Sequence, residues 1–266
     1  MFCNVMTALL TLYPLLLTQG LWAAHRAPRL PEADGPRCAT VGSGLPLRLL
    51  LLGDSSVAGV GAETQDDALA GQISRRLAKG RQVSYRVIAR TGATTLDALK
   101  MLEAEAPEPF DVAVIGLGVN DTKNGLTRKT WKRSYARILD RLTEDFGVRR
   151  IVASGMPPVE RMPILPYPLR EALGGRARLF DKMLRDLAEN RANVTYMPMD
   201  FPMCTSDMAP DGFHAGPAIY DAWGAAFAHA ITHGHPAPRP VPTPARPSRP
   251  GPHPDPVTLQ RPGPAQ

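Results

Sequence analysis

Apolar residues between positions 46 and 233 form short runs that alternate with longer helical stripes. The short runs predict buried β-strands at residues 46–52, 83–89, 111–117, 149–154 and 194–197. Apolar residues that recur every three or four positions predict helices at residues 65–79, 94–104, 131–146, 176–190 and 216–232. Because strands and helices alternate, we expect an α/β fold with a sheet of five parallel strands between two layers of helices.

The two flanks of this central part have different patterns. Residues 1–24 form an apolar segment that resembles a signal peptide or a short membrane anchor, although its nearest basic residues follow the apolar part. We interpret residues 25–45 as a linker and residues 46–233 as one folded domain. Residues 234–266 are rich in proline and poor in large apolar side chains, which predicts a disordered tail. We therefore expect membrane association or export, and a cytoplasmic location stays open.

The net charge of +6 lies largely in these flanks. Residues 234–266 alone carry four arginines and one aspartate, whereas a nucleic-acid-binding protein concentrates basic residues on its folded part. We therefore expect no nucleic-acid partner, and the sequence leaves the oligomeric state open.

No pattern of metal ligands stands out. Cys3, Cys38 and Cys204 lack metal-binding spacing, and both a Cys38–Cys204 disulfide and unpaired cysteines are compatible with the sequence. His229 and His233 have the spacing of a metal pair, but they fall away from the apolar stripe of their helix. A solvated helix end, where the dipole favours imidazolium, is the better interpretation, and we expect no metal site.

Ser55 is the candidate nucleophile. It follows Gly53 and Asp54 at the carboxyl end of the first predicted strand, which is where open α/β sheets place their chemistry. Gly53 permits a tight turn there, and small residues leave the hydroxyl accessible. Ser56 is adjacent, so some ambiguity about the nucleophile remains.

A serine nucleophile needs a base, a group that orients the base, and donors for an oxyanion. His214 lies between the fifth predicted strand and the last helix, three residues after Asp211. The glycine between them lets the carboxylate reach the imidazole ring and fix its tautomer. Asp-x-x-His pairs also occur as helix caps, so the pair is informative only together with Ser55.

Candidate oxyanion donors follow the second and third predicted strands. Gly92 offers a backbone N–H that a ligand can approach closely, and Asn120 offers a side-chain amide at the mouth of the sheet. Either residue can instead belong to an ordinary turn, and we expect the adjacent Asp121 to cap the following helix.

One long segment interrupts the alternation of strands and helices. Residues 155–173 contain five prolines and emerge at the same edge of the sheet as Ser55. We expect them to wall an apolar substrate pocket, and a loop that only covers the core is the alternative. The candidate substrate contacts are Met156, Pro157, Pro158 and Met162.

The blocks Gly53-Asp54-Ser55, Gly92, Gly118-x-Asn120-Asp121 and Asp211-x-x-His214, in this order, resemble those of the SGNH hydrolase (GDSL-type lipase/esterase) superfamily. The resemblance implies a flavodoxin-like three-layer α/β/α sandwich, no metal or organic cofactor, and a small-molecule ester or lipid substrate. It also implies a Ser55–His214–Asp211 triad and an oxyanion hole made by the Ser55 and Gly92 N–H groups and the Asn120 side chain. Thr91 departs from the family pattern, where asparagine is frequent.

These residues predict a serine esterase that cleaves short to medium acyl esters or lipid esters through an acyl-enzyme. A carbohydrate O-acetylesterase of the same fold is the closest alternative. A catalytically inactive domain that binds a ligand or partner is an alternative of another class. A nucleotide site after Gly59 and Gly61 is disfavoured, because Thr64 stands where a third glycine is required.

Overall fold

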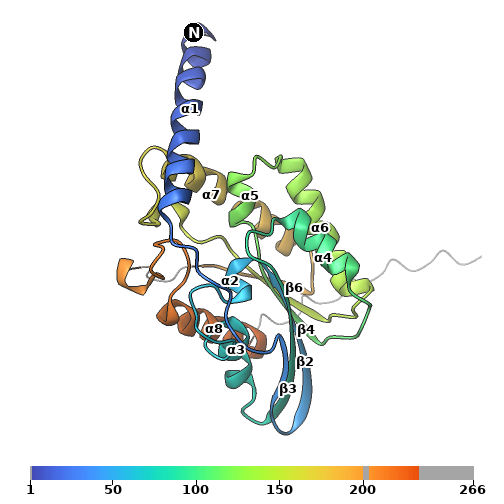
Figure 1. Cartoon of the computed structure of the whole chain (residues 1–266). Helices are drawn as coiled ribbons and strands as arrows, with labels where there is room; N and C mark the ends of the chain where they lie inside the picture. Colours follow the sequence, from blue (N-terminus) through green and yellow to red (C-terminus); the bar gives the residue numbers. More distant parts are fainter. Residues whose placement is uncertain (1, 200–203, 234–266) are drawn as a thin grey trace, which may run out of the picture.

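The computed structural model describes residues 2–199 and 204–233, which form a sheet covered by helices on both faces (Figure 1). The strands are β1 (Cys38–Gly42), β2 (Leu45–Gly53), β3 (Arg81–Ala89), β4 (Val112–Gly116), β5 (Arg150–Ser154) and β6 (Val194–Met197). The α-helices are α1 (Phe2–Arg26), α2 (Ser55–Ala58), α3 (Leu69–Leu77), α4 (Thr95–Ala104), α5 (Val119–Lys123), α6 (Arg128–Glu144), α7 (Leu169–Glu189) and α8 (Pro217–His233). Two short 3₁₀ helices, η1 (Val159–Arg161) and η2 (Thr205–Asp207), lie in loops.

The sheet has the strand order β1-β3-β2-β4-β5-β6. The strands from β2 to β6 are parallel to one another, and their order is that of a flavodoxin-like sheet, as expected from the sequence. The order reverses at β2, with β3 on one side and β4 on the other. Ligands of open α/β sheets bind at such a switch point, next to the carboxyl ends of the strands.

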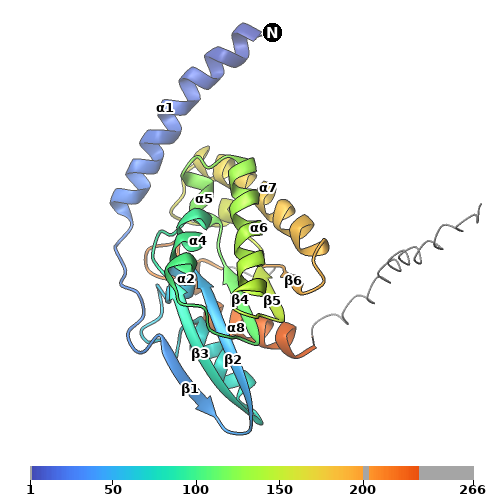
Figure 2. The ribbon, with the colours of Figure 1, turned by 90° about the vertical axis from the view of Figure 1, so that its right-hand side faces the viewer.

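The sheet has six strands rather than the five expected. The additional strand, β1, lies within residues 25–45, the segment interpreted as a linker, and pairs antiparallel with the edge of β3 (Figure 2). Its sequence, Cys-Ala-Thr-Val-Gly, lacks a run of large apolar residues, and none of its five residues is buried. The periodicity that revealed the other strands is therefore absent.

The central strands are apolar throughout because both faces of the sheet are buried. Leu50 and Leu52 of β2 point into one core with Trp131 and Tyr135 of α6, and this core also takes residues from α4 and α7. Leu49 and Leu51 point into the opposite core, which α3 and α8 cover. These layers fix the ends of the strands, where the candidate chemistry lies.

The N-terminal helix α1 projects from the body of the molecule (Figures 1 and 2). Its Gln19 is bonded to the start of α7: the side-chain amide donates to Tyr167 O at 2.7 Å and accepts from the Leu169 N–H at 3.1 Å. Within residues 2–199 and 204–233, no helix combines the length and hydropathy of a membrane span. Residues 1–24 as a signal peptide or anchor therefore stay a prediction, and the expected tail at 234–266 lies outside the described residues.

The structure also shows where two cysteines and two histidines singled out in the sequence lie. Cys38 and Cys204 are free and exposed, so they do not form a disulfide here. His229 and His233 are exposed near the end of α8, where the sequence placed a solvated helix end.

Candidate active site

The turn between β2 and α2 presents Ser55 at the carboxyl edge of the sheet. Gly53 is required at this turn, because a Cβ atom there would lie 2.2 Å from Cγ2 of Val57. Asp54 caps α2 by accepting the Ser56 N–H at 3.0 Å, and Ser55 is the first residue of the helix. Ser55 is buried to 6% exposure, and its hydroxyl faces a cavity.

The hydroxyl of Ser55, the imidazole of His214 and the carboxylate of Asp211 form one chain of hydrogen bonds. The Ser55 Oγ is 2.9 Å from His214 Nε2, and His214 Nδ1 is 2.5 Å from Asp211 Oδ2. An ionised carboxylate only accepts hydrogen bonds, so the ring proton lies on Nδ1 and Nε2 is left to accept the serine proton. The three residues that the sequence predicted as a triad are therefore in hydrogen-bond contact.

Asp211 is fixed independently of the histidine ring. Its other oxygen, Oδ1, accepts the backbone N–H groups of Phe213 and His214, both at 2.9 Å. Burial alone would raise the pKa of Asp211, but the hydrogen bonds from His214 and Phe213 outweigh it and lower the pKa below its usual value. The carboxylate is thus held ionised beside the ring.

Asn120 lies on α5, is buried, and lines the same cavity as Ser55. Its side-chain N–H₂ donates to Asp54 Oδ2 at 3.3 Å and to the backbone oxygen of Ala93 at 3.1 Å. Burial raises the pKa of Asp54 to about 6, and its two oxygens accept from the Ser56 N–H and the Asn120 amide. Both hydrogens of the Asn120 amide are already donated. To bind an oxyanion, the amide must break one of these two hydrogen bonds, and the bond to Asp54 is the longer and weaker of them.

Gly92 lies in the turn after β3, which pairs with β2 so that Ala89 stands opposite Gly53. Its φ angle of +78° favours glycine, and a Cβ atom there would meet nothing within 4 Å. Its N–H has no acceptor among the described residues. The structure therefore brings Gly92 to the same edge as Ser55, next to the Ala93 carbonyl that holds Asn120, although Gly92 does not line the cavity.

The sequence predicted that Asp121 caps the helix that follows it, and this prediction is wrong. Asp121 lies inside the short helix α5, and its carboxylate accepts the Thr95 N–H at 3.1 Å and the Thr95 hydroxyl at 2.9 Å. These bonds anchor the start of α4, a helix that precedes it in the chain. Sequence position alone could not show this, because the partner is 26 residues away.

A cavity of about 50 Å³ opens beside the Ser55 hydroxyl. Its polar lining includes Ser55, Asn120 and His214, and its apolar lining includes Leu117, Ile219 and Trp223.

The proline-containing segment contributes to this cavity and also covers the core. Pro157 and Met162 line the cavity, whereas Met156 and Pro158 line a neighbouring groove of about 530 Å³, to which Pro157 also contributes. Met156 and Met162 are at the same time part of the hydrophobic core. The segment is shorter than expected, because α7 begins at Leu169 rather than near residue 176.

Sequence reasoning missed some residues around the cavity. Trp223 was recognised only as a core residue of the last helix, yet its ring lines the cavity and its Nε1–H donates to Ser154 Oγ at 3.2 Å. Ser154 ends β5 and carries no motif. A polar residue at the end of a buried strand is the only sequence signal that could have marked it.

Comparisons with known proteins agree with this fold. A lipase/acylhydrolase from Enterococcus faecalis superposes with a TM-score of 0.52 at 20% identity, over 73% of this chain and 99% of its own. An aryl esterase from M. smegmatis gives a TM-score of 0.56 at 17% identity, and the superposition covers 70% of this chain and 99% of the esterase. A carbohydrate esterase family 2 enzyme from Corynascus thermopiles gives a TM-score of 0.56 at 15% identity, and the superposition covers 77% of this chain and 68% of the enzyme. At these identities the similarity shows the fold alone.

A search of curated proteins gives no significant sequence match. The model of the GDSL-like lipase/acylhydrolase family, however, matches residues 51–222, well over half of the chain. That region begins in β2 just before Ser55 and ends in α8 just after His214, so it contains every block on which the resemblance was based. The chain belongs to the GDSL-like lipase/acylhydrolase family.

Proposed function

We propose that this protein is a serine esterase that hydrolyses carboxylic esters of short acyl groups through an acyl-enzyme. The observation that carries the proposal is the continuous hydrogen-bonded line from Ser55 Oγ through His214 to Asp211. Catalysis by such a triad depends on this geometry and on the tautomer that the carboxylate fixes.

In the proposed reaction, Ser55 Oγ attacks the ester carbonyl carbon while His214 Nε2 takes the serine proton. The carbonyl oxygen becomes an oxyanion, for which the Ser55 and Gly92 N–H groups and the Asn120 amide are the proposed donors. The protonated His214 then gives its proton to the leaving alcohol as the C–O bond breaks. Water, deprotonated by the same histidine, cleaves the acyl-enzyme and restores the Ser55 hydroxyl.

Asn120→Ala is expected to lower kcat roughly a hundredfold, because losing one oxyanion donor raises the barrier by about 3 kcal/mol. KM should change much less, since the charge to be stabilised develops only in the transition state. Steady-state kinetics with thermal melting checks this. Asn124→Ala is a matched control at the residue that directly follows the same short helix, because the exposed Asn124 side chain has no hydrogen bond among the described residues. An unchanged kcat in Asn120→Ala would contradict the role of this amide.

The small cavity beside the nucleophile, about 50 Å³, supports the proposed preference for short acyl groups. In a series of p-nitrophenyl esters, we expect kcat/KM to be highest for acetate to butyrate and to fall roughly tenfold or more by octanoate. The physical reason is that a longer chain overfills the cavity formed by Leu117, Ile219 and Trp223. A profile that rises towards octanoate would show that the acyl chain binds elsewhere.

A carbohydrate O-acetylesterase is a second candidate, and the groove beside the cavity favours it. Pro157 and Met199 line both spaces, so a substrate can extend from one into the other. The rest of the groove carries charged side chains suited to a hydroxyl-rich alcohol: Glu160, Arg161, Arg178, Asp181, Lys182, Arg185 and Asp186. A sharp preference for acetate over butyrate in the same series would favour this candidate.

A further inference from the structure

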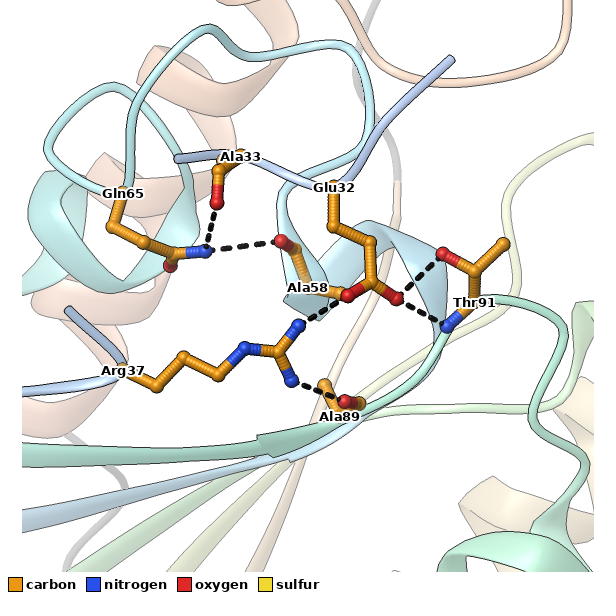
Figure 3. A network of polar contacts seen from close by, with 7 residues as sticks. All are labelled: Glu32, Ala33, Arg37, Ala58, Gln65, Ala89 and Thr91. Atoms are coloured by element: carbon orange, nitrogen blue, oxygen red, sulfur yellow. Dashed lines mark hydrogen bonds and ion pairs between the residues drawn. The ribbon is translucent and has the colours of Figure 1, made fainter. Parts of the chain in front are cut away.

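The segment between α1 and β1, residues 27–37, is bonded to the catalytic edge of the sheet (Figure 3). Gln65 Nε2 donates to the backbone oxygens of Ala33 and Ala58, both at 3.1 Å, and the Ala33 N–H donates to Ala58 O at 3.3 Å. Ala58 is the last residue of α2, the helix that begins at Ser55. The segment is therefore attached to the helix that carries the nucleophile.

Within this segment, the carboxylate of Glu32 reaches the turn that follows β3. Its Oε1 accepts both the N–H and the hydroxyl of Thr91, each at 2.7 Å, and its Oε2 pairs with Arg37 (Figure 3). Arg37 in turn donates to Ala89 O, at the end of β3, at 2.6 Å. Hydrogen bonds from Thr91 and Arg37 outweigh partial burial and lower the pKa of Glu32, so the carboxylate is ionised in the folded protein.

Thr91 directly precedes Gly92, the proposed backbone donor of the oxyanion hole. On the other side of Gly92, the Ala93 carbonyl accepts the Asn120 amide at 3.1 Å. Gly92 is thus the middle residue of a turn held at both ends. One end is held by a second proposed oxyanion donor, and the other by Glu32, which lies 59 residues away in the sequence.

We propose that Glu32 is a positioning residue, which through Thr91 holds the Gly92 N–H in the orientation that the oxyanion requires. The proposal rests on the proposed esterase function. Glu32 itself contacts neither the cavity nor Ser55, so it acts only through the turn. Charge-assisted bonds to a backbone N–H are among the stronger hydrogen bonds in proteins, which suits them to fixing a glycine-containing turn.

The test measures an inhibitor that forms an oxyanion. The serine oxygen adds to the carbonyl carbon of a trifluoromethyl ketone, and the ketone oxygen becomes an anion at the position of the reaction's oxyanion. The Ki of this inhibitor therefore reports the oxyanion hole directly. In Glu32→Ala, we expect kcat to fall and Ki to rise by the same factor, roughly tenfold, while KM changes less than about twofold. Asp34→Ala is the matched control, because Asp34 is exposed on the same segment and its carboxylate has no hydrogen bond among the described residues.

Thr91→Val is the second variant, and it decides the question if Glu32→Ala fails to fold. It removes the hydroxyl bond to Glu32 but keeps the backbone bond, so Ki and kcat should shift together by a smaller factor, roughly threefold. An unchanged Ki in the folded variants would overturn the positioning role, even if their melting temperature fell. Failure of the wild-type protein to react with a fluorophosphonate at all would instead count against the proposed esterase function.

Discussion

Ser55→Ala is expected to lower kcat for ester hydrolysis by roughly 10⁴-fold or more, the scale on which serine hydrolases lose activity when the nucleophile is removed. The substitution removes only the hydroxyl group, whose oxygen lies 2.9 Å from His214 Nε2. The variant should fold normally, because Ser55 contributes no side-chain bond to the cap of α2, which Asp54 provides. Steady-state kinetics with a p-nitrophenyl ester measures the effect.

Ser56→Ala is the matched control for this experiment. Ser56 is the next residue of α2, and the bond that it makes to Asp54 uses its backbone N–H, which alanine retains. We expect its kcat to stay within about tenfold of the wild-type value, as for a substitution beside a site that leaves the reacting groups in place. If Ser56→Ala lost activity and Ser55→Ala kept it, the assignment of the nucleophile would be wrong.

Asp211→Asn is expected to lower kcat by roughly 10⁴-fold while leaving the protein folded. The amide oxygen of asparagine can still accept the backbone N–H groups of Phe213 and His214, so the loop keeps its bonds. The amide N–H₂, however, would face Nδ1 of His214 and donate to it. The ring proton would then move to Nε2, which could no longer accept the proton of Ser55.

The control for Asp211→Asn is Asp207→Asn, the same chemical change on η2 a few residues earlier. Among the residues that the structure describes, the Asp207 side chain has one long bond, which it accepts from Ser206 Oγ at 3.4 Å. Its kcat and melting temperature should match those of the wild type. Full activity in Asp211→Asn would show that the carboxylate is a cap of the loop rather than a partner of the base.

The sequence predicted those parts of the fold whose signal is local. Leu49 to Leu52 form a continuous apolar run because alternate side chains point into the two cores, and this run ends at Gly53 where the strand ends. The same reasoning places Ser55, Asn120 and the Asp211–His214 pair at one edge, since parallel strands all present their carboxyl ends there.

The sequence could not reveal contacts that depend on how distant segments meet. The edge strand β1 lacks an apolar pattern because its side chains are only partly buried. In the sequence, Glu32 is one acidic residue in a segment interpreted as a linker. It reaches Thr91 because β1 pairs antiparallel with β3, which brings the residues before β1 to the end of β3. Asp121 likewise belongs to the family motif in the sequence, but its partner Thr95 lies 26 residues earlier, at the start of α4.

Covalent labelling shows directly whether Ser55 is an activated nucleophile. The protein is treated with a fluorophosphonate and digested with trypsin, and the peptide covering residues 49–75, which contains both Ser55 and Ser56, is fragmented in a mass spectrometer. We expect one phosphonyl adduct on Ser55, and none when His214 is replaced by alanine. An adduct on Ser56, or no adduct on a folded wild-type protein, would contradict this assignment.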